Sequence, residues 1–175
     1  MKIELRNLDQ IDPGQLAYFA NDKRVCQYLR NSFPHPYTVY DAMQFIQFSI
    51  EHHQVDFAIV VNDICVGCIG VTFQKDIYCQ NCELGYWLGV DYWNKGIMSY
   101  VIPLVCQFVF DNFIVTKIYA EVFADNTASA HLLEKCGFSK EGYFKKHIYK
   151  NGHHYDAIFI YMFFEISFFR KTTFF

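Results

Sequence analysis

The sequence predicts an α/β domain, because strand-like and helix-like patterns alternate along its 175 residues. Short apolar runs recur from the first residues to about residue 164, and between them apolar residues repeat at helical spacing. Glycine, proline and asparagine mark the turns between these segments. Because no linker interrupts the chain, we expect one domain over residues 1–175, with an aromatic C-terminal tail at residues 165–175.

The first fifty residues predict a strand and two helices with recognisable caps. Apolar and polar residues alternate over Lys2–Asn7, which indicates the strand. Asp12 is placed to cap the first helix, with Gln15 completing a capping box. Thr38 and Asp41 form the same pattern at the start of the longer helix.

The centre of the chain predicts a strand that passes through a glycine turn into a helix. A hairpin over residues 56–73 precedes this strand, which covers residues 82–90. The turn contains Gly96, and apolar residues then recur at helical spacing. The first turn of a helix leaves N–H groups unpaired, with the positive end of the helix dipole behind them. We therefore expect an anion site at this turn.

The C-terminal third predicts a buried strand, a short helix and a long hairpin. The strand is Lys117–Phe123, and Asn126 is expected to cap the helix that Gly137 ends. The pair Asn151-Gly152 is a strong signal for the tight turn of the hairpin. The second strand of the hairpin, residues 157–164, is apolar on both faces, so we expect it to be central in the sheet.

Two motifs resemble the GNAT acetyltransferase superfamily, and especially its branch of ribosomal-protein N-terminal (alanine) acetyltransferases. The first is GYWLGVDYWNKGIMS, residues 85–99, at the place of the acyl-CoA pyrophosphate loop. Only Gly96 fits the strict form of that loop, [QR]-x-x-G-x-[GA], whereas Trp93 and Met98 depart from it. The second motif is N-x-x-S-x-x-L-x-E-K-x-G-F, residues 126–138.

The resemblance covers the chain to about residue 164 and implies the GNAT fold. That fold is a mixed, twisted sheet of six or seven strands with helices on both faces. The strand ending at Gly89 and Val90 splays from its neighbour, Lys117–Phe123, and acetyl-CoA lies in the gap. The implied activity is an N-acetyltransferase that moves an acetyl group from acetyl-CoA to a primary amine by direct attack on the thioester. The amine belongs to a protein N-terminus or to a small molecule.

The resemblance and the helix N-terminus together indicate the cofactor-binding residues. Backbone N–H groups of the loop are expected to bind the pyrophosphate, with a lysine adding charge and a serine adding a hydroxyl. These residues are Asn94, Lys95, Gly96, Ile97, Met98 and Ser99. An N–H near Leu88 or Gly89, freed where the strands part beside Val90, is expected to hold the carbonyl oxygen. Asn126 matches a residue that contacts the CoA arm.

Glu83 and Ser129 are the candidate catalytic residues. Glu83 is a carboxylate among apolar neighbours on the central strand, which suits it to accept a proton from the amine, directly or through water. Ser129 matches the position at which this branch carries a serine near the CoA sulfur. Many other GNAT enzymes carry a tyrosine one turn later, where this chain has Leu133. We therefore expect Ser129 to donate a hydrogen bond to the leaving thiolate.

Two other functions remain open from the sequence. One is a catalytically idle acyl-CoA-binding module, which the departures at Trp93 and Met98 favour, as does Ile148, where some relatives carry an acidic residue. The other is a zinc-dependent interaction module, because Cys65-x-x-Cys68 and Cys79-x-x-Cys82 have the spacing of a zinc ribbon. On a β-hairpin these two pairs lie about 20 Å apart, so we assign no metal ligand.

Charge and hydrophobicity limit the expected partners. The net charge of −3 gives no electrostatic reason for a nucleic-acid partner. The longest apolar run, Ala157–Phe164, is too short to cross a bilayer, and the first residues lack a signal-peptide pattern. We therefore expect a cytoplasmic monomer or homodimer with no membrane partner. The phenylalanine-rich tail caps the core, covers a partner subunit or frays, and the sequence does not choose among these.

Overall fold

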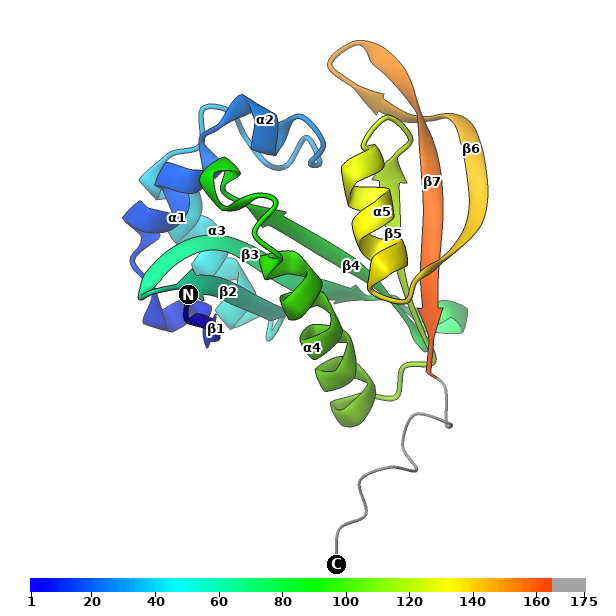
Figure 1. The fold of residues 1–175 in the computed structure, drawn as a ribbon, viewed down its shortest axis with the longest axis horizontal. Helices are drawn as coiled ribbons and strands as arrows, with labels where there is room; N and C mark the ends of the chain where they lie inside the picture. Colours follow the sequence, from blue (N-terminus) through cyan, green and yellow to red (C-terminus); the bar gives the residue numbers. More distant parts are fainter. Residues whose placement is uncertain (165–175) are drawn as a thin grey trace, which may run out of the picture.

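A computed structural model describes residues 1–164, which form one seven-stranded sheet with helices on both faces (Figure 1). The strands are β1 (Ile3–Asn7), β2 (Val55–Val61), β3 (Ile64–Phe73), β4 (Asn81–Leu88), β5 (Lys117–Phe123), β6 (Ser139–Lys150) and β7 (His153–Phe163). The α-helices are α1 (Pro13–Ala20), α2 (Lys23–Cys26), α3 (Val39–Glu51), α4 (Ile97–Asn112) and α5 (Thr127–Lys135). Three short 3₁₀ helices lie in the connections between these elements: η1 (Leu8–Gln10), η2 (Asp76–Tyr78) and η3 (Val90–Tyr92). The predicted fold class is confirmed, and the predicted tail at residues 165–175 lies outside the described residues.

The strand order is β1-β2-β3-β4-β5-β7-β6, and every neighbouring pair is antiparallel except β4 and β5. These two parallel strands pair over three residues only, ending with Glu83 opposite Tyr119. Beyond that pair β4 continues beside β3 to Leu88, and β5 continues beside β7 to Phe123. Figure 1 shows β4 and β5 diverging from their common end. The predicted splay is therefore present, and it begins after Glu83.

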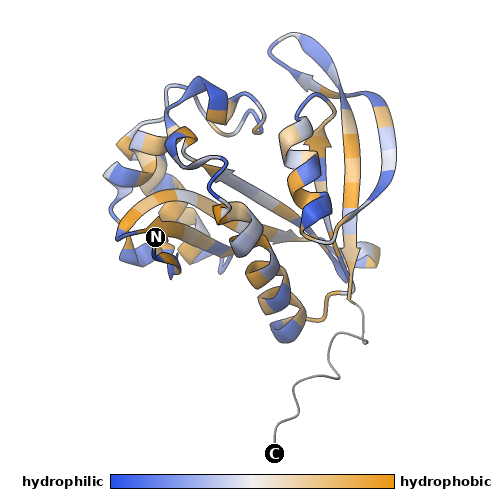
Figure 2. Cartoon of the chain, in the orientation of Figure 1, coloured by the Kyte–Doolittle hydropathy of each residue, from blue (hydrophilic) through white to orange (hydrophobic). Residues whose placement is uncertain are grey.

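Side chains on the two faces of the sheet form two separate hydrophobic cores. One core lies between the sheet and helices α4 and α5, and it includes the fully buried Ile102 and Leu133. The other lies between the sheet and helices α1 and α3, and it includes the fully buried Leu16 and Ala42. Figure 2 shows hydrophobic residues along β2 and β3, in contrast to the largely hydrophilic β6, which is mostly exposed. Even-numbered residues of β4 and β5 therefore face α4 and α5, and odd-numbered residues face the opposite side.

The predicted helix caps are present, with one correction. Asp12 accepts a hydrogen bond from the Gly14 N–H at 2.8 Å, and Thr38 and Asp41 form a reciprocal capping box. Gln15 does not complete a box, because its side-chain oxygen accepts the Cys65 N–H at 2.8 Å. The β2–β3 register shifts beside this position, so the Cys65 N–H takes its partner from α1 instead of the ladder.

The C-terminal hairpin has the predicted turn, and its second strand lies in the interior of the sheet. Asn151 and Gly152 both have positive φ, 52° and 82°, as a type I′ turn requires. β7 pairs with β5 on one side and β6 on the other, so both of its edges are used. β7 is therefore an interior strand, as its apolar pattern predicted, and β6 forms the outer edge of the sheet.

The β3–β4 hairpin places the two cysteine pairs apart from each other. Cys68 lies opposite Trp87 at one end, and Cys82 lies opposite Phe73 at the other end. Within residues 1–164 no group of three or more His, Cys, Asp or Glu side chains is arranged to hold a metal ion. Over the same residues, none of the helices has the length and apolar character needed to span a bilayer.

Candidate active site

The turn before α4 has the backbone of an anion-binding site. Gly96 is the N-cap residue, with φ +75°, in the left-handed region that glycine adopts without strain. Among the described residues, no side chain caps this end of the helix, so the N–H groups of Ile97–Ser99 have no capping partner. A Cβ built on Gly96 would meet nothing within 4 Å. The space beside the Gly96 Cα is therefore open.

The side chains around this turn divide into exposed and buried ones. Asn94 and Lys95 are exposed, and the Lys95 Nζ lies 5.1 Å from the centre of the Tyr92 ring. Ile97 and Met98 are only 1% and 8% exposed, because their side chains belong to the core beneath α4. These two residues offer a ligand their backbone N–H groups only.

The end of β4 directs one backbone N–H into the opening between β4 and β5. The Gly89 N–H donates to the Val66 carbonyl on β3 at 2.7 Å, so it does not face the opening. Because successive strand residues direct their N–H groups to opposite edges, the Leu88 N–H points toward β5. The Leu88 carbonyl accepts the Trp93 indole N–H at 2.7 Å, which fixes this strand end just before Val90 starts η3. Of the two expected donors, Leu88 fits and Gly89 does not.

Ser129 and Asn126 lie at the N-terminus of α5. The Asn126 side chain caps the helix by accepting the Ser129 N–H at 3.2 Å. The Ser129 hydroxyl lies 2.7 Å from the hydroxyl of Tyr86, an even-numbered residue of β4. Burial raises the pKa of Tyr86 to about 12, so its phenol stays protonated at neutral pH and can donate to Ser129. That hydrogen bond leaves the Ser129 proton free for another acceptor.

Glu83 lies on the opposite face of the sheet and is ion-paired. Its two carboxylate oxygens accept hydrogen bonds from Arg30 Nη2 at 2.5 and 2.7 Å. Arg30 belongs to the loop after α2, and its hydrogen bond to Glu83 raises the Arg30 pKa. The Glu83 side chain is 19% exposed. The apolar neighbours of Glu83 in the sequence did not reveal this ion pair, because its cation comes from a loop 53 residues away.

A cavity of about 370 Å³ opens beside Glu83. The loop after α2 and strands β4, β5 and β6 line it, with Tyr28, Leu29, Arg30, Asn31, Glu83, Glu121, Phe123, Ile148, Tyr149 and Lys150. The buried Lys150 ammonium donates to the carbonyls of Cys26, at 2.7 Å, and Leu29. Burial lowers the pKa of Lys150. These bonds hold the loop against β6 and so form one wall of the cavity.

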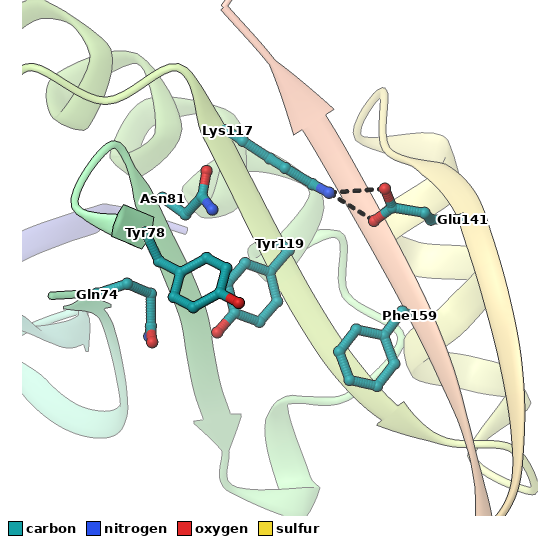
Figure 3. A pocket seen from close by; sticks show the side chains of 7 residues that line it. All are labelled: Gln74, Tyr78, Asn81, Lys117, Tyr119, Glu141 and Phe159. Carbon is teal, nitrogen blue, oxygen red and sulfur yellow. Dashed lines mark hydrogen bonds and ion pairs between the residues drawn. The ribbon is translucent and has the colours of Figure 1, made fainter. Parts of the chain in front are cut away.

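A second cavity, of about 280 Å³, lies on the same face at the paired end of β4 and β5 (Figure 3). Lys117 Nζ donates to both carboxylate oxygens of Glu141 at 2.6 and 2.7 Å, and the rings of Tyr78, Tyr119 and Phe159 form much of the remaining wall. None of the predicted site residues lines it. The candidate active site is therefore the opening between the strands, with the larger cavity beside it.

The polar groups of this site approach the opening from two faces. Tyr86 and Ser129 lie on the side of α4 and α5, together with the N-terminus of α4. Glu83 and Glu121 lie on the other side, in the larger cavity. Sequence reasoning missed Arg30, Tyr86 and Glu121. Strand alternation was an available signal for the last two, whereas nothing local marks Arg30.

The parallel strand pair that parts beside a glycine-capped helix fits an acyl-CoA-dependent acyltransferase, and comparison with known proteins agrees. Residues 2–139 match the Acetyltransferase (GNAT) domain family. The chain therefore belongs to the GNAT family and is an acetyltransferase of that family.

Individual relatives extend the match along the chain. The uncharacterized N-acetyltransferase YoaA of Bacillus subtilis (strain 168) is 40% identical over 78 residues, which cover 45% of this chain and 44% of that protein. The SPbeta prophage-derived uncharacterized N-acetyltransferase YokL of the same organism is 30% identical over 155 residues, or 86% of this chain and 85% of that protein. The structure of RimL, a ribosomal L7/L12 alpha-N-protein acetyltransferase in complex with coenzyme A, has a TM-score of 0.82 at 19% identity, covering 93% and 94% of the chains. At that identity the likeness shows the fold alone.

Proposed function

We propose that the protein transfers the acetyl group of acetyl-CoA to a primary amine by direct attack of the amine on the thioester. The amine belongs to a protein N-terminus or to a small molecule. The observation that carries this proposal is the parting of β4 and β5 beside the open N-terminus of α4. The fold neighbour RimL, an alpha-N-protein acetyltransferase whose structure is a complex with coenzyme A, supports it. The net charge of −3 supports an acceptor other than a nucleic acid.

The residues around Gly96 fit the pyrophosphate of CoA. The N–H groups of Gly96–Ser99 are expected to hold it, with Asn94 and Lys95 at the exposed edge of the site. Asn126 holds the start of α5 in place and is expected to contact the CoA arm. When bound, acetyl-CoA supplies the acetyl group as a thioester. The Leu88 N–H is placed to stabilise the charge that develops on its carbonyl oxygen.

The catalytic residues are expected to act from the two faces. Glu83 accepts a proton from the amine, directly or through water, and Arg30 holds the carboxylate in place. Ser129 donates a hydrogen bond to the departing thiolate. Tyr86 supports this role, because its phenol hydrogen-bonds the Ser129 hydroxyl and orients it. Tyr86 is thus a positioning residue.

Ligand-dependent melting followed by an acceptor screen tests the proposal. CoA and acetyl-CoA should both raise the melting temperature, because the site exists only in the folded protein and a ligand at 100 times its Kd adds about 2.7 kcal/mol. Thiol release from acetyl-CoA should then require an amine. No melting shift at millimolar CoA would remove the proposal. A shift without turnover of any amine would favour an idle acyl-CoA-binding module.

A further inference from the structure

Glu121 lies on the wall of the opening between the diverging strands. It follows Tyr119, the last β5 residue paired with β4, by two positions. Two strand residues span about 6.6 Å, so Glu121 lies beyond the point at which the strands part. Its odd-numbered position places it on the same face as Glu83, and both residues line the 370 Å³ cavity. The cavity therefore contains two carboxylates, one from each diverging strand.

The two carboxylates differ in their partners. Both oxygens of Glu83 accept hydrogen bonds from Arg30. Among residues 1–164, the Glu121 side chain makes no hydrogen bond, and its ion-pair partner, His147 Nε2, is 3.9 Å away. The Glu121 side chain is only 26% exposed. A carboxylate that is mostly withdrawn from water and lacks a donor is suited to an incoming ammonium group, since charge-assisted hydrogen bonds are the strong ones.

The charges in the cavity set how many cations it accepts. Two cations, Arg30 and Lys150, and two anions, Glu83 and Glu121, line it, so the formal charge is zero. Arg30 hydrogen-bonds Glu83 and also attracts Glu121 at longer range, and Lys150 is engaged with backbone carbonyls. Of the two carboxylates, Glu121 alone has no hydrogen-bond donor among residues 1–164, so it remains for a ligand. If the acceptor carried a second cation, the positive charges of Arg30 and Lys150 would repel it.

We infer that Glu121 binds the ammonium group of the acceptor, and that the acceptor brings one cation into this cavity. The inference rests on the proposed function and adds a substrate class, an amine with a single cation, in preference to a polyamine. It also gives the two carboxylates different roles. Glu121 binds the amine, whereas Glu83 accepts its proton.

Kinetics and binding of Glu121→Gln test the inference with two probes. Alaninamide carries one ammonium group, and spermidine carries several. The matched control is Glu134→Gln, the same change at an exposed position of α5. Steady-state rates at saturating acetyl-CoA give kcat and KM. Calorimetric titration of alaninamide into the protein with bound CoA gives its Kd without turnover.

We expect Glu121→Gln to raise both the KM and the Kd of alaninamide by about tenfold or more, the effect of losing a hydrogen bond to a charged group. Its kcat should stay within about twofold, and Glu134→Gln should match the parent protein. The parent protein should prefer alaninamide over spermidine in kcat/KM. A preference for spermidine, unchanged binding in Glu121→Gln, or failure to acetylate alaninamide while another amine is acetylated would overturn the inference. Failure of the proposed function differs from these outcomes, because it appears as a missing CoA melting shift or as a shift without turnover of any amine.

Discussion

Gly96→Ala is expected to separate CoA binding from folding. Gly96 has φ +75°, a conformation that costs a residue with a side chain about 1–2 kcal/mol. The added Cβ would meet nothing within 4 Å, so no steric cost is added. In a chain of this length, about 1 kcal/mol corresponds to a melting-temperature loss of roughly 2–4 °C. The variant should therefore fold.

The effect on CoA should be larger than the effect on folding. The methyl group would enter open space beside the N-cap of α4, where the pyrophosphate is expected. Loss of one hydrogen bond to a charged group costs about 1.5–3 kcal/mol, which weakens affinity by about tenfold or more. Titration calorimetry with CoA, well below the melting temperature, measures this loss directly.

Gly152→Ala is the matched control. Gly152 has φ +82°, its Cβ position is equally open, and it lies in the turn between β6 and β7. This variant should lose similar stability and keep the CoA affinity of the parent protein. Equal losses of affinity in both variants would mean that destabilisation, not the site, weakens binding. Normal affinity in Gly96→Ala would place CoA away from the start of α4.

Three further predictions concern single side chains. Glu83→Gln should lower kcat at pH 7 and leave the acetyl-CoA Kd unchanged. The loss of kcat should be smaller for α-amines than for ε-amines, whose pKa is about 10.4. Full turnover of the variant on its best acceptor would exclude Glu83 as the base. Tyr86→Phe and Ser129→Ala should lower kcat to a similar degree, because each breaks the same hydrogen-bonded pair of hydroxyl groups. The double variant should then lose little more than either single variant, and additive losses would contradict this reasoning. Burial raises the pKa of Asp56, and this effect outweighs the lowering by its hydrogen bond from Ser49. The protonated carboxyl group therefore stabilises the folded protein at acid pH, and this stabilisation is lost as pH rises through the folded pKa. Asp56→Asn should therefore raise the melting temperature more at pH 7 than at pH 4, and a pH-independent shift would refute this reasoning.

Local patterns were enough to predict most of the fold. The bounds of β5 agree with the sequence prediction to the residue, because its apolar alternation is bounded by clear turns. The capping box of Thr38 and Asp41 is likewise formed within four residues. Gln15 had the same local signal but was redirected by a backbone N–H on β3, which is 50 residues away in the sequence. Local patterns fail to predict the partner of a side chain where a segment distant in the sequence supplies a competing hydrogen-bond donor.

The candidate site shows the same division. Gly96 and Asn126 were predictable, since their roles depend on the helices that they begin. The partner of Glu83 was not, because Arg30 reaches it from a loop whose path depends on the buried bonds of Lys150. Glu121 carried a signal in the alternation of β5, but its importance depends on where β4 and β5 part. That point is a property of the sheet and not of either strand.

The arrangement of the site also argues for direct transfer rather than an acetylated cysteine. Cys82 lies on β4 within the stretch paired with β5 and is fully buried, and burial raises its pKa to about 12, so very little thiolate exists at neutral pH. The side proposed for the thiol, with Tyr86 and Ser129, and the side proposed for the amine, with Glu83, meet at the opening from opposite faces. In this proposal both substrates are bound together, so initial-rate plots should give intersecting lines. Parallel lines, as in ping-pong kinetics, would require a covalent intermediate and would refute this geometry.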